Sequence, residues 1–383
     1  MVVAKLGNSA GILLSVLRST RYTRRRLGRF WRERMLSQGP CGQGGGGGNS
    51  SILVVIYNEW LTYYLQTLKW PTLECPNEDG CVKILLVADP QILGEQSENP
   101  LLTLIFNLDS DGFLAKTYAR VVSYFRPDVV VFLGDLMDEG SYASRPEFYR
   151  YVKRIPQIFN TEHPIKHVWI PGDNDIGGEN EPIHPEKIKM FEASFNQPDV
   201  ISVKYVDIYK TNYLTQLLPD SPHSHPSSNV TKVAISHMPL LLTPDRFSAN
   251  VLTSIQPAVI FSGHRHLASY LEATIDNLFK KNRIKILRPQ DDNQVMEIEL
   301  KPEEFHEFII PTCSYRMGAR DVGYGAAIID SQSKIVKLRY ISVKFSKLCD
   351  YFVKIDVFRI TQTNVRAKIN YESTNFELEN HFY

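Results

Sequence analysis

Metal-ligating side chains stand in five places of this 383-residue sequence, each time directly after a short apolar segment. The five places are Asp89-Pro90-Gln91, Gly134-Asp135-Leu136-Met137-Asp138, Gly172-Asp173-Asn174-Asp175, Ser236-His237 and Gly263-His264-Arg265-His266. Carboxylates and imidazoles bind divalent cations such as Mn²⁺, Fe²⁺ and Zn²⁺. A single Gly-Asp or a single histidine is more often a turn or an ordinary core residue, so the signal lies in the ordered succession. The sequence therefore predicts a site for divalent metal ions.

The segments before these residues are predicted to be buried strands, because they are short, apolar and rich in β-branched residues. They cover residues 82–88, 129–133, 167–170, 232–235 and 258–261. In an open α/β sheet, ligands bind beyond the carboxyl ends of the strands. We therefore expect side chains from several strands to meet there.

Helices predicted at residues 115–125 and 146–159 separate the first three strands. Alternating strands and helices indicate parallel strands joined by right-handed crossovers, with helices covering the sheet. Later strands, predicted with few helices between them, indicate a second and more antiparallel sheet. These later strands include residues 201–208, 307–311 and 326–329. The predicted fold class is α/β, a layered fold of two mixed β-sheets flanked by helices, over residues 80–345, with a charged insertion at 280–304.

The regions on either side of this core differ from it in composition. Residues 1–50 are basic and Gly-rich, and a pentaglycine at 44–48 predicts a flexible linker in a disordered region. Residues 346–383 are a polar tail. Over the whole chain, 43 Lys and Arg residues balance 42 Asp and Glu residues, so the composition gives no indication of nucleic acid as a partner.

Residues 51–70 are a candidate transmembrane helix, because the stretch has about the length needed to cross a bilayer. Glu59 and Lys69 make it a marginal span, whereas Trp60 and Trp70 suit the membrane interface. The arginines before it would keep the N-terminus cytoplasmic by the positive-inside rule. An amphipathic core helix is the alternative for this stretch, and the acid-poor N-terminus with its arginines and serines also fits a mitochondrial presequence.

The five cysteines are scattered and form no CxxC pair. This spacing argues against a zinc knuckle or a dense disulfide framework. Cys75 and Cys81 could pair in an oxidising compartment, and the sequence leaves that pairing open.

The order Asp-x-x, Gly-Asp-x-x-Asp, Gly-Asn-His-Asp, His and Gly-His-x-His is typical of the calcineurin-like metallophosphoesterases, which this chain resembles. The finer resemblance is to their membrane-tethered branch, which includes the cell-division-control proteins and the GPI-anchor ethanolamine-phosphate phosphodiesterase. It rests on Ala88 to Gln91, Gly134 to Gly140, Asp175-Ile176-Gly177 and the stretch from Asn58 to Pro71. The similarity covers about residues 52–341, and it implies a layered metallophosphoesterase fold with an N-terminal membrane helix.

The resemblance implies two divalent metal ions, Mn²⁺ with Fe or Zn as alternatives. By motif, Asp89 and His266 would bind the first metal, and Asp135 would bridge both metals. Asp173, His237 and His264 would hold the second metal.

Two positions depart from the general family pattern. Gln91 stands where the superfamily has a histidine ligand, although the resembled branch also tends to have Gln. An amide oxygen binds transition metals more weakly than an imidazole does. Asn174 stands where the family has the histidine that contacts phosphate and protonates the leaving oxygen, and an amide cannot act as a general acid near pH 7.

The resemblance implies a phosphodiesterase that removes ethanolamine phosphate from the GPI anchors of proteins. Its location would be the membrane of the endoplasmic reticulum, its exit sites or the Golgi, with a lumenal catalytic domain. The alternatives are a phosphatase for another phosphate ester and a catalytically weak metal-binding adaptor in trafficking.

Overall fold

The computed structural model describes residues 57–70, 72–75, 80–96, 100–161, 163–179, 181–219, 230–278, 295–319 and 321–343. The predictions for residues 1–50, for the first part of the candidate span and for the polar tail lie outside these residues. The same holds for most of the charged insertion.

The first sheet has the strand order β3-β2-β1-β11-β12-β9. Its strands are β1 (Cys81–Val87), β2 (Val129–Phe132), β3 (Lys166–Trp169), β9 (Val295–Glu299), β11 (Gly323–Asp330) and β12 (Ile335–Ser342). The strands β1, β2 and β3 run parallel, whereas β11, β12 and β9 pair antiparallel. The sheet is therefore mixed, and the carboxyl ends of its three parallel strands lie at one edge.

The second sheet has the order β4-β5-β6-β7-β10-β8. Its strands are β4 (Val200–Val203), β5 (Val206–Lys210), β6 (Thr231–Ser236), β7 (Val259–Ser262), β8 (Ser269–Thr274) and β10 (Glu304–Ile309). Here β5, β6, β7 and β10 are parallel, and β4 and β8 are antiparallel edge strands. The prediction of two mixed sheets flanked by helices is confirmed.

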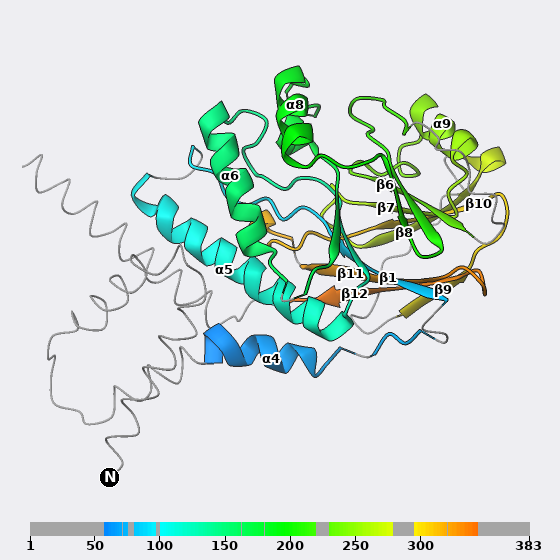
Figure 1. Ribbon diagram of the computed structural model, residues 1–383, viewed down its shortest axis with the longest axis horizontal. Coiled ribbons are helices and arrows are strands. Elements are labelled where there is room, and N and C mark those ends of the chain that lie inside the picture. The colour runs from blue at the N-terminus through cyan, green and yellow to red at the C-terminus, as the bar shows by residue number, and fades with distance from the viewer. Residues whose placement is uncertain are drawn as a thin grey trace, which may run out of the picture. The chain divides into compact units, whose positions relative to one another are not determined.

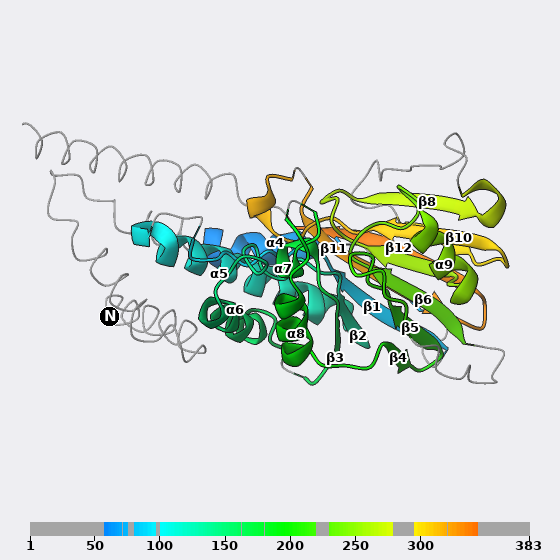
Figure 2. The ribbon, with the colours of Figure 1, turned by 90° about the horizontal axis from the view of Figure 1, so that it is seen from above.

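Helices cover the outer face of each sheet, which Figures 1 and 2 show from two directions. The longer helices are α5 (Pro100–Phe125), α6 (Arg145–Ile158), α8 (Pro185–Ser194) and α9 (Arg246–Ser254). The short ones are α4 (Thr62–Thr67), α7 (Asp173–Ile176), η2 (Tyr57–Leu61), η3 (Ile275–Asn277) and η4 (Tyr315–Met317). One apolar cluster joins α5, α6 and α8 to the first sheet, a second lies between the sheets, and a third joins α9 to the second sheet.

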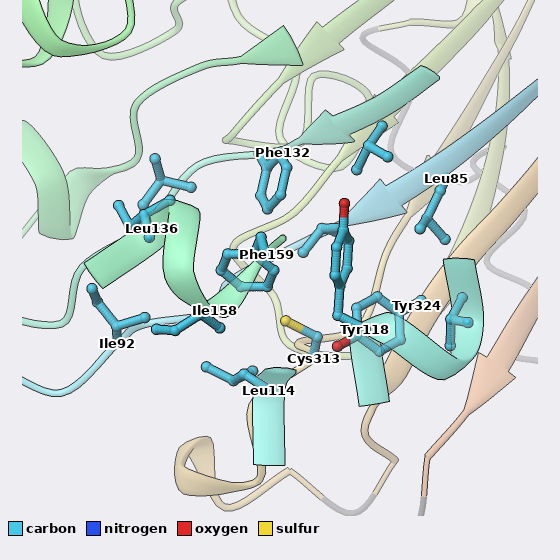
Figure 3. Close-up of a cluster of buried hydrophobic side chains, with 14 of the residues drawn as sticks. Leu85, Ile92, Leu114, Tyr118, Phe132, Leu136, Ile158, Phe159, Cys313 and Tyr324 are labelled. Atoms are coloured by element: carbon cyan, nitrogen blue, oxygen red, sulfur yellow. The ribbon is translucent and has the colours of Figure 1, made fainter. Parts of the chain in front are cut away.

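Strand β1 explains why the apolar strands could be recognised. Leu85 and Val87 pack under the helices, whereas Ile84 and Leu86 pack between the sheets. A strand that is buried on both faces has a continuous apolar sequence. Figure 3 shows Leu85 in the cluster under the helices. Phe132 and Phe159 meet there with ring centroids 5.0 Å apart.

Several elements differ from the prediction. Helix α5 begins at Pro100 rather than near 115, and the strand predicted at 201–208 is a hairpin of β4 and β5. Strand β9 lies inside the stretch predicted as a charged insertion, where its pairing with β12 outweighs the charged sequence. The helices α8 and α9 and the strands β8 and β12 were not predicted.

The described part of the candidate membrane segment forms η2 and α4, which pack against α5. The Tyr63 and Phe113 rings meet edge to face at 6.3 Å, and the Arg120 guanidinium lies 5.9 Å from the centroid of the Trp60 ring. The Trp70 indole donates to the Ser342 carbonyl at 3.3 Å. Among the described residues, no helix combines the length and the apolar character that crossing a membrane requires. Anchoring by residues 51–70 stays a prediction, because residues 51–56 lie outside the described part.

A disulfide joins Cys75 to Cys81, the first residue of β1. The pairing that the sequence left open is therefore present in the structure.

Candidate metal centre

The structure brings all seven predicted ligands to one region. Asp89 and Gln91 follow β1, Asp135 follows β2, and Asp173 is the first residue of α7 after β3. His237 follows β6, and His264 and His266 follow β7. Both sheets therefore contribute, each from the carboxyl ends of its parallel strands.

Five of these residues have a left-handed backbone. The φ values are 48° for Asp89, 39° for Gln91, 51° for Asp135, 66° for His264 and 55° for His266. Positive φ is uncommon outside glycine, and such residues cluster at functional sites. The strand ends are thus shaped to aim side chains at one point.

Gly134 permits the turn before Asp135. Its φ is 90°, and a Cβ there would lie 2.6 Å from His237 Nδ1 and 2.8 Å from the Gly172 nitrogen. Any side chain at this position would push apart the loops that carry the candidate ligands.

The first candidate group consists of Asp173, His237 and His264. The Asp173 Oδ1 atom lies 2.9 Å from His237 Nε2 and 3.2 Å from His264 Nδ1. These are the three residues that the resemblance assigned to the second metal.

The second candidate group consists of Asp89, Asp135 and His237. The Asp135 Oδ1 atom is 3.4 Å from His237 Nε2, and the Asp89 Oδ1 atom is 4.0 Å from His237 Nδ1. The two groups share His237, whereas the resemblance assigned the bridging role to Asp135. The individual ligand roles stay predictions.

The His237 ring has a defined orientation. Its Nδ1 lies 2.8 Å from the Leu133 carbonyl, which only accepts hydrogen bonds, so Nδ1 carries the proton. That leaves Nε2 facing Asp135 and Asp173. Hydrogen bonding of the other ring nitrogen is how metal-binding histidines are usually oriented.

Gln91 and His266 lie at the edge of the second group. The Gln91 amide donates to Asp135 Oδ2 at 2.9 Å and lies 3.2 Å from His266 Nε2. His266 Nε2 is 3.8 Å from Asp89 Oδ1. A ligand role for Gln91 would require its oxygen, not its nitrogen, to face the metals.

The electrostatics of the site fit divalent cations. Burial raises the pKa of both Asp89 and Asp135. Burial also acts to lower the pKa of His237, but Asp135, Asp173 and Asp89 outweigh it and raise that pKa to about 10. Clustered carboxylates buried without water are costly unless positive charge neutralises them. The oxygen and nitrogen donors present match Mn²⁺, Fe²⁺ or Zn²⁺.

Asn174 lies against one of the candidate ligands. Its backbone nitrogen donates to Asp135 Oδ1 at 3.0 Å, and its side-chain amide donates to Asp135 Oδ2 at 2.9 Å. The residue is half-buried, whereas Asp135 is buried.

Asp175 has a positioning role that sequence reasoning missed. Its buried carboxylate accepts hydrogen bonds from the backbone nitrogens of Leu136 at 3.1 Å, Met137 at 3.0 Å and Gly172 at 2.9 Å. Burial and the nearby Asp135 raise the pKa of Asp175 to about 7, although these hydrogen bonds act to lower it. It ties the loop of Asp135 to the loop of Asp173. Its place in the Gly-Asp-Asn-Asp motif was the available signal.

Thr312 and Glu139 support the loop after β1. The Thr312 hydroxyl donates to the Asp89 carbonyl at 2.7 Å. The Glu139 carboxylate accepts hydrogen bonds from the backbone nitrogens of Glu95 at 2.8 Å and Gln96 at 2.9 Å. Glu139 lies in the motif that also carries Asp135, but nothing in the sequence pointed to its partners.

Residues 82–268 match the calcineurin-like phosphoesterase family. These residues form a calcineurin-like phosphoesterase domain. The resemblance to the calcineurin-like metallophosphoesterases is thereby confirmed for this domain, and the domain implies a divalent metal centre.

Curated relatives of the phosphoesterase domain carry the name Metallophosphoesterase 1. The Caenorhabditis elegans homolog is 28% identical over 38% of this chain and 39% of its own length. The Danio rerio protein is 29% identical over 43% of this chain and 41% of its own length. The Drosophila melanogaster homolog is 30% identical over 36% of both chains. The match thus spans about two fifths of each of these relatives.

A crystal structure of a metallophosphoesterase from Sphaerobacter thermophilus is also similar to this chain. It has a TM-score of 0.35 and 15% identity, and the match covers 68% of this chain and 88% of that chain.

Proposed function

We propose that this chain is a two-metal phosphodiesterase that removes ethanolamine phosphate from GPI anchors. The observation that carries the catalytic part is the meeting of two candidate ligand groups at His237, buried at the ends of strands from both sheets. The substrate part rests on the resemblance of the Asp89, Asp135 and Asp175 motifs to the membrane-tethered branch.

The chemistry divides between the metals and the chain. When bound, two divalent ions supply Lewis acidity toward the phosphate oxygens and lower the pKa of water, so no protein nucleophile is required. Asp89, Asp135, Asp173 and the histidines would hold the ions. Asn174 can donate a hydrogen bond to a phosphate oxygen, but it cannot protonate the leaving group.

A location at the membrane of the early secretory pathway, with the domain in the lumen, is part of the proposal. The Cys75–Cys81 disulfide supports an oxidising compartment. Exposed aromatic and leucine side chains on η2 and α4, and just after α4, support contact with a membrane interface. They are Tyr57, Trp60, Tyr64, Leu65 and Leu68.

Turnover of a simple phosphodiester by the purified full-length chain with Mn²⁺ tests the catalytic part. We expect hydrolysis that EDTA abolishes and added Mn²⁺ restores. A second assay, with a lipid-linked phosphoethanolamine, tests the substrate class against a phosphate monoester. Faster turnover of the monoester would favour a phosphatase for another ester.

Asn174 favours a second candidate function, a catalytically weak adaptor that binds metals for stability. The absent general acid is the specific observation behind it. Metal binding without turnover of any phosphodiester would support the adaptor and exclude the enzyme.

The proposed topology predicts which of two sequons is glycosylated. Asn49-Ser50-Ser51 precedes the candidate span, and Asn229-Val230-Thr231 follows it. With the domain in the lumen, only Asn229 should carry a glycan, which mass spectrometry of Asn49→Gln and Asn229→Gln variants would assign. A glycan at Asn49, or release of the protein by alkaline carbonate, would contradict this topology.

A further inference from the structure

Glu307 is a fully buried carboxylate on β10 that lies outside both candidate ligand groups. On the same strand Phe305 and Ile309, each two residues away, belong to the apolar cluster under α9. Alternate residues of a strand point to the same face, so Glu307 is placed on that apolar side. A buried carboxylate is costly there unless its oxygens are satisfied.

Both Glu307 oxygens accept backbone hydrogen bonds from one loop. Oε1 accepts a hydrogen bond from the Leu240 nitrogen at 2.8 Å, and Oε2 accepts one from the Leu241 nitrogen at 2.7 Å. These nitrogens belong to the segment that leads away from His237. Hydrogen bonds to an ionised acceptor are roughly twice as strong as neutral ones, so this contact fixes the segment firmly.

The His237 segment is held at further points. The Ser236 hydroxyl donates to the Met238 carbonyl at 2.7 Å, and the Gly263 nitrogen donates to the His237 carbonyl at 3.0 Å. The ring itself is held through Nδ1 by the Leu133 carbonyl. Glu307 is the charged member of this set of contacts.

We infer that Glu307 is a positioning residue that holds His237 in the orientation in which it belongs to both candidate ligand groups. It does so through the backbone of Leu240 and Leu241, without touching metal or substrate. Because His237 belongs to both groups, a shift of its loop would weaken both metal positions at once. The inference rests on the proposed metal-dependent function.

Asp330 offers a matched control. It lies at the end of β11, and its Oδ1 accepts hydrogen bonds from the backbone nitrogens of Gln332 at 3.0 Å and Ser333 at 3.1 Å. Asp330 pairs with Cys81, at the start of β1, so it lies at the opposite strand end from the candidate ligands. It shares the chemistry of Glu307 without the neighbouring histidine.

The experiment measures Mn²⁺ affinity by calorimetry on the full-length chain, at pH 8 because burial raises the pKa of Glu307 to about 7. In Glu307→Gln one acceptor becomes an NH₂ group that faces a backbone N–H. We expect the dissociation constant to rise about 10–100-fold, as for other residues that orient metal ligands. Asp330→Asn should change the dissociation constant for Mn²⁺ by less than about twofold, even if both variants lower Tm.

A double-mutant cycle tests whether Glu307 acts through His237. In a His237→Ala background, Glu307→Gln should weaken Mn²⁺ binding by less than about twofold, because coupled residues are not additive. Full additivity would overturn the inference. If Glu307→Gln does not fold, Glu307→Asp replaces it with the same expectations.

The outcomes separate the inference from the proposed function. Unchanged Mn²⁺ affinity in Glu307→Gln would overturn the inference and leave the proposed function standing. A wild-type chain that binds no Mn²⁺ would overturn both.

Discussion

Asp135→Asn should leave the purified chain almost free of metal and lower phosphodiester turnover by about 10³-fold, since metal ions contribute several kcal/mol to such reactions. Asparagine has nearly the same shape as aspartate, so the variant should keep its fold. Among the candidate ligands, Asp135 is the one that the family resemblance assigns to both metals, so its loss is expected to have the largest effect on metal content.

The contacts of Asp135 give the reason. Its Oδ2 accepts hydrogen bonds from both Gln91 and Asn174, and its Oδ1 accepts one from the Asn174 backbone and lies 3.4 Å from His237 Nε2. Asparagine removes a buried negative charge. Whichever way its amide is turned, an NH₂ group then faces one of these donors.

Elemental analysis of the variant checks this expectation, with His264→Ala as the comparison. By the family motif His264 would hold only the second metal whereas Asp135 would bridge both, so the loss of His264 should deplete mainly one metal position. Full metal occupancy in Asp135→Asn would mean that the roles assigned to this site are wrong.

Asn174→His should raise kcat/KM on an alkyl phosphodiester by about 10²-fold or more, the range of general acid catalysis. An alkoxide leaving group, such as the oxygen of ethanolamine or a sugar, must be protonated as it departs. A nitrophenolate leaves without a proton, so the aryl ester should gain less than about tenfold.

The structure makes this substitution practicable. Asn174 is half-buried, and its backbone nitrogen would still donate to Asp135 after the change. Only the side-chain hydrogen bond to Asp135 Oδ2 is lost. The variant therefore tests the missing acid without removing the backbone contact that holds the loop.

The measurement is kcat/KM on both esters at matched metal occupancy. Asn174→Gln is the control, because it enlarges the side chain without adding an acid. Equal effects on the two esters, or loss of activity on both, would show that position 174 does not have the role of the family histidine.

The meeting of the candidate ligands could be predicted because it follows from strand direction. Asp89 and Asp135 follow β1 and β2, strands that are buried on both faces and have unmistakable apolar sequences. Strand β3, which precedes Asp173, is an edge strand that is only partly buried. Parallel strands bring their carboxyl ends to one edge. The proximity of these side chains was therefore readable, whereas their individual ligand roles stay predictions.

The supporting contacts could not be predicted, because they join distant parts of the chain. Glu307 is 66 or 67 residues along the chain from the loop whose backbone nitrogens donate hydrogen bonds to it, and nothing in the local sequence specifies this pairing. Strand β9 was missed for a similar reason, since alternating charged residues pair there with β12. The contact of α4 with α5 also depends on tertiary packing rather than on periodicity.

Metal stoichiometry of the wild-type chain tests the central claim of a two-metal phosphoesterase most directly. The full-length protein would be equilibrated with Mn²⁺, freed of unbound metal by gel filtration and analysed for its elements. We predict about two metal ions in each chain, the number that the two-metal mechanism requires. A chain that retains no metal, or a single ion under saturating conditions, would contradict this account.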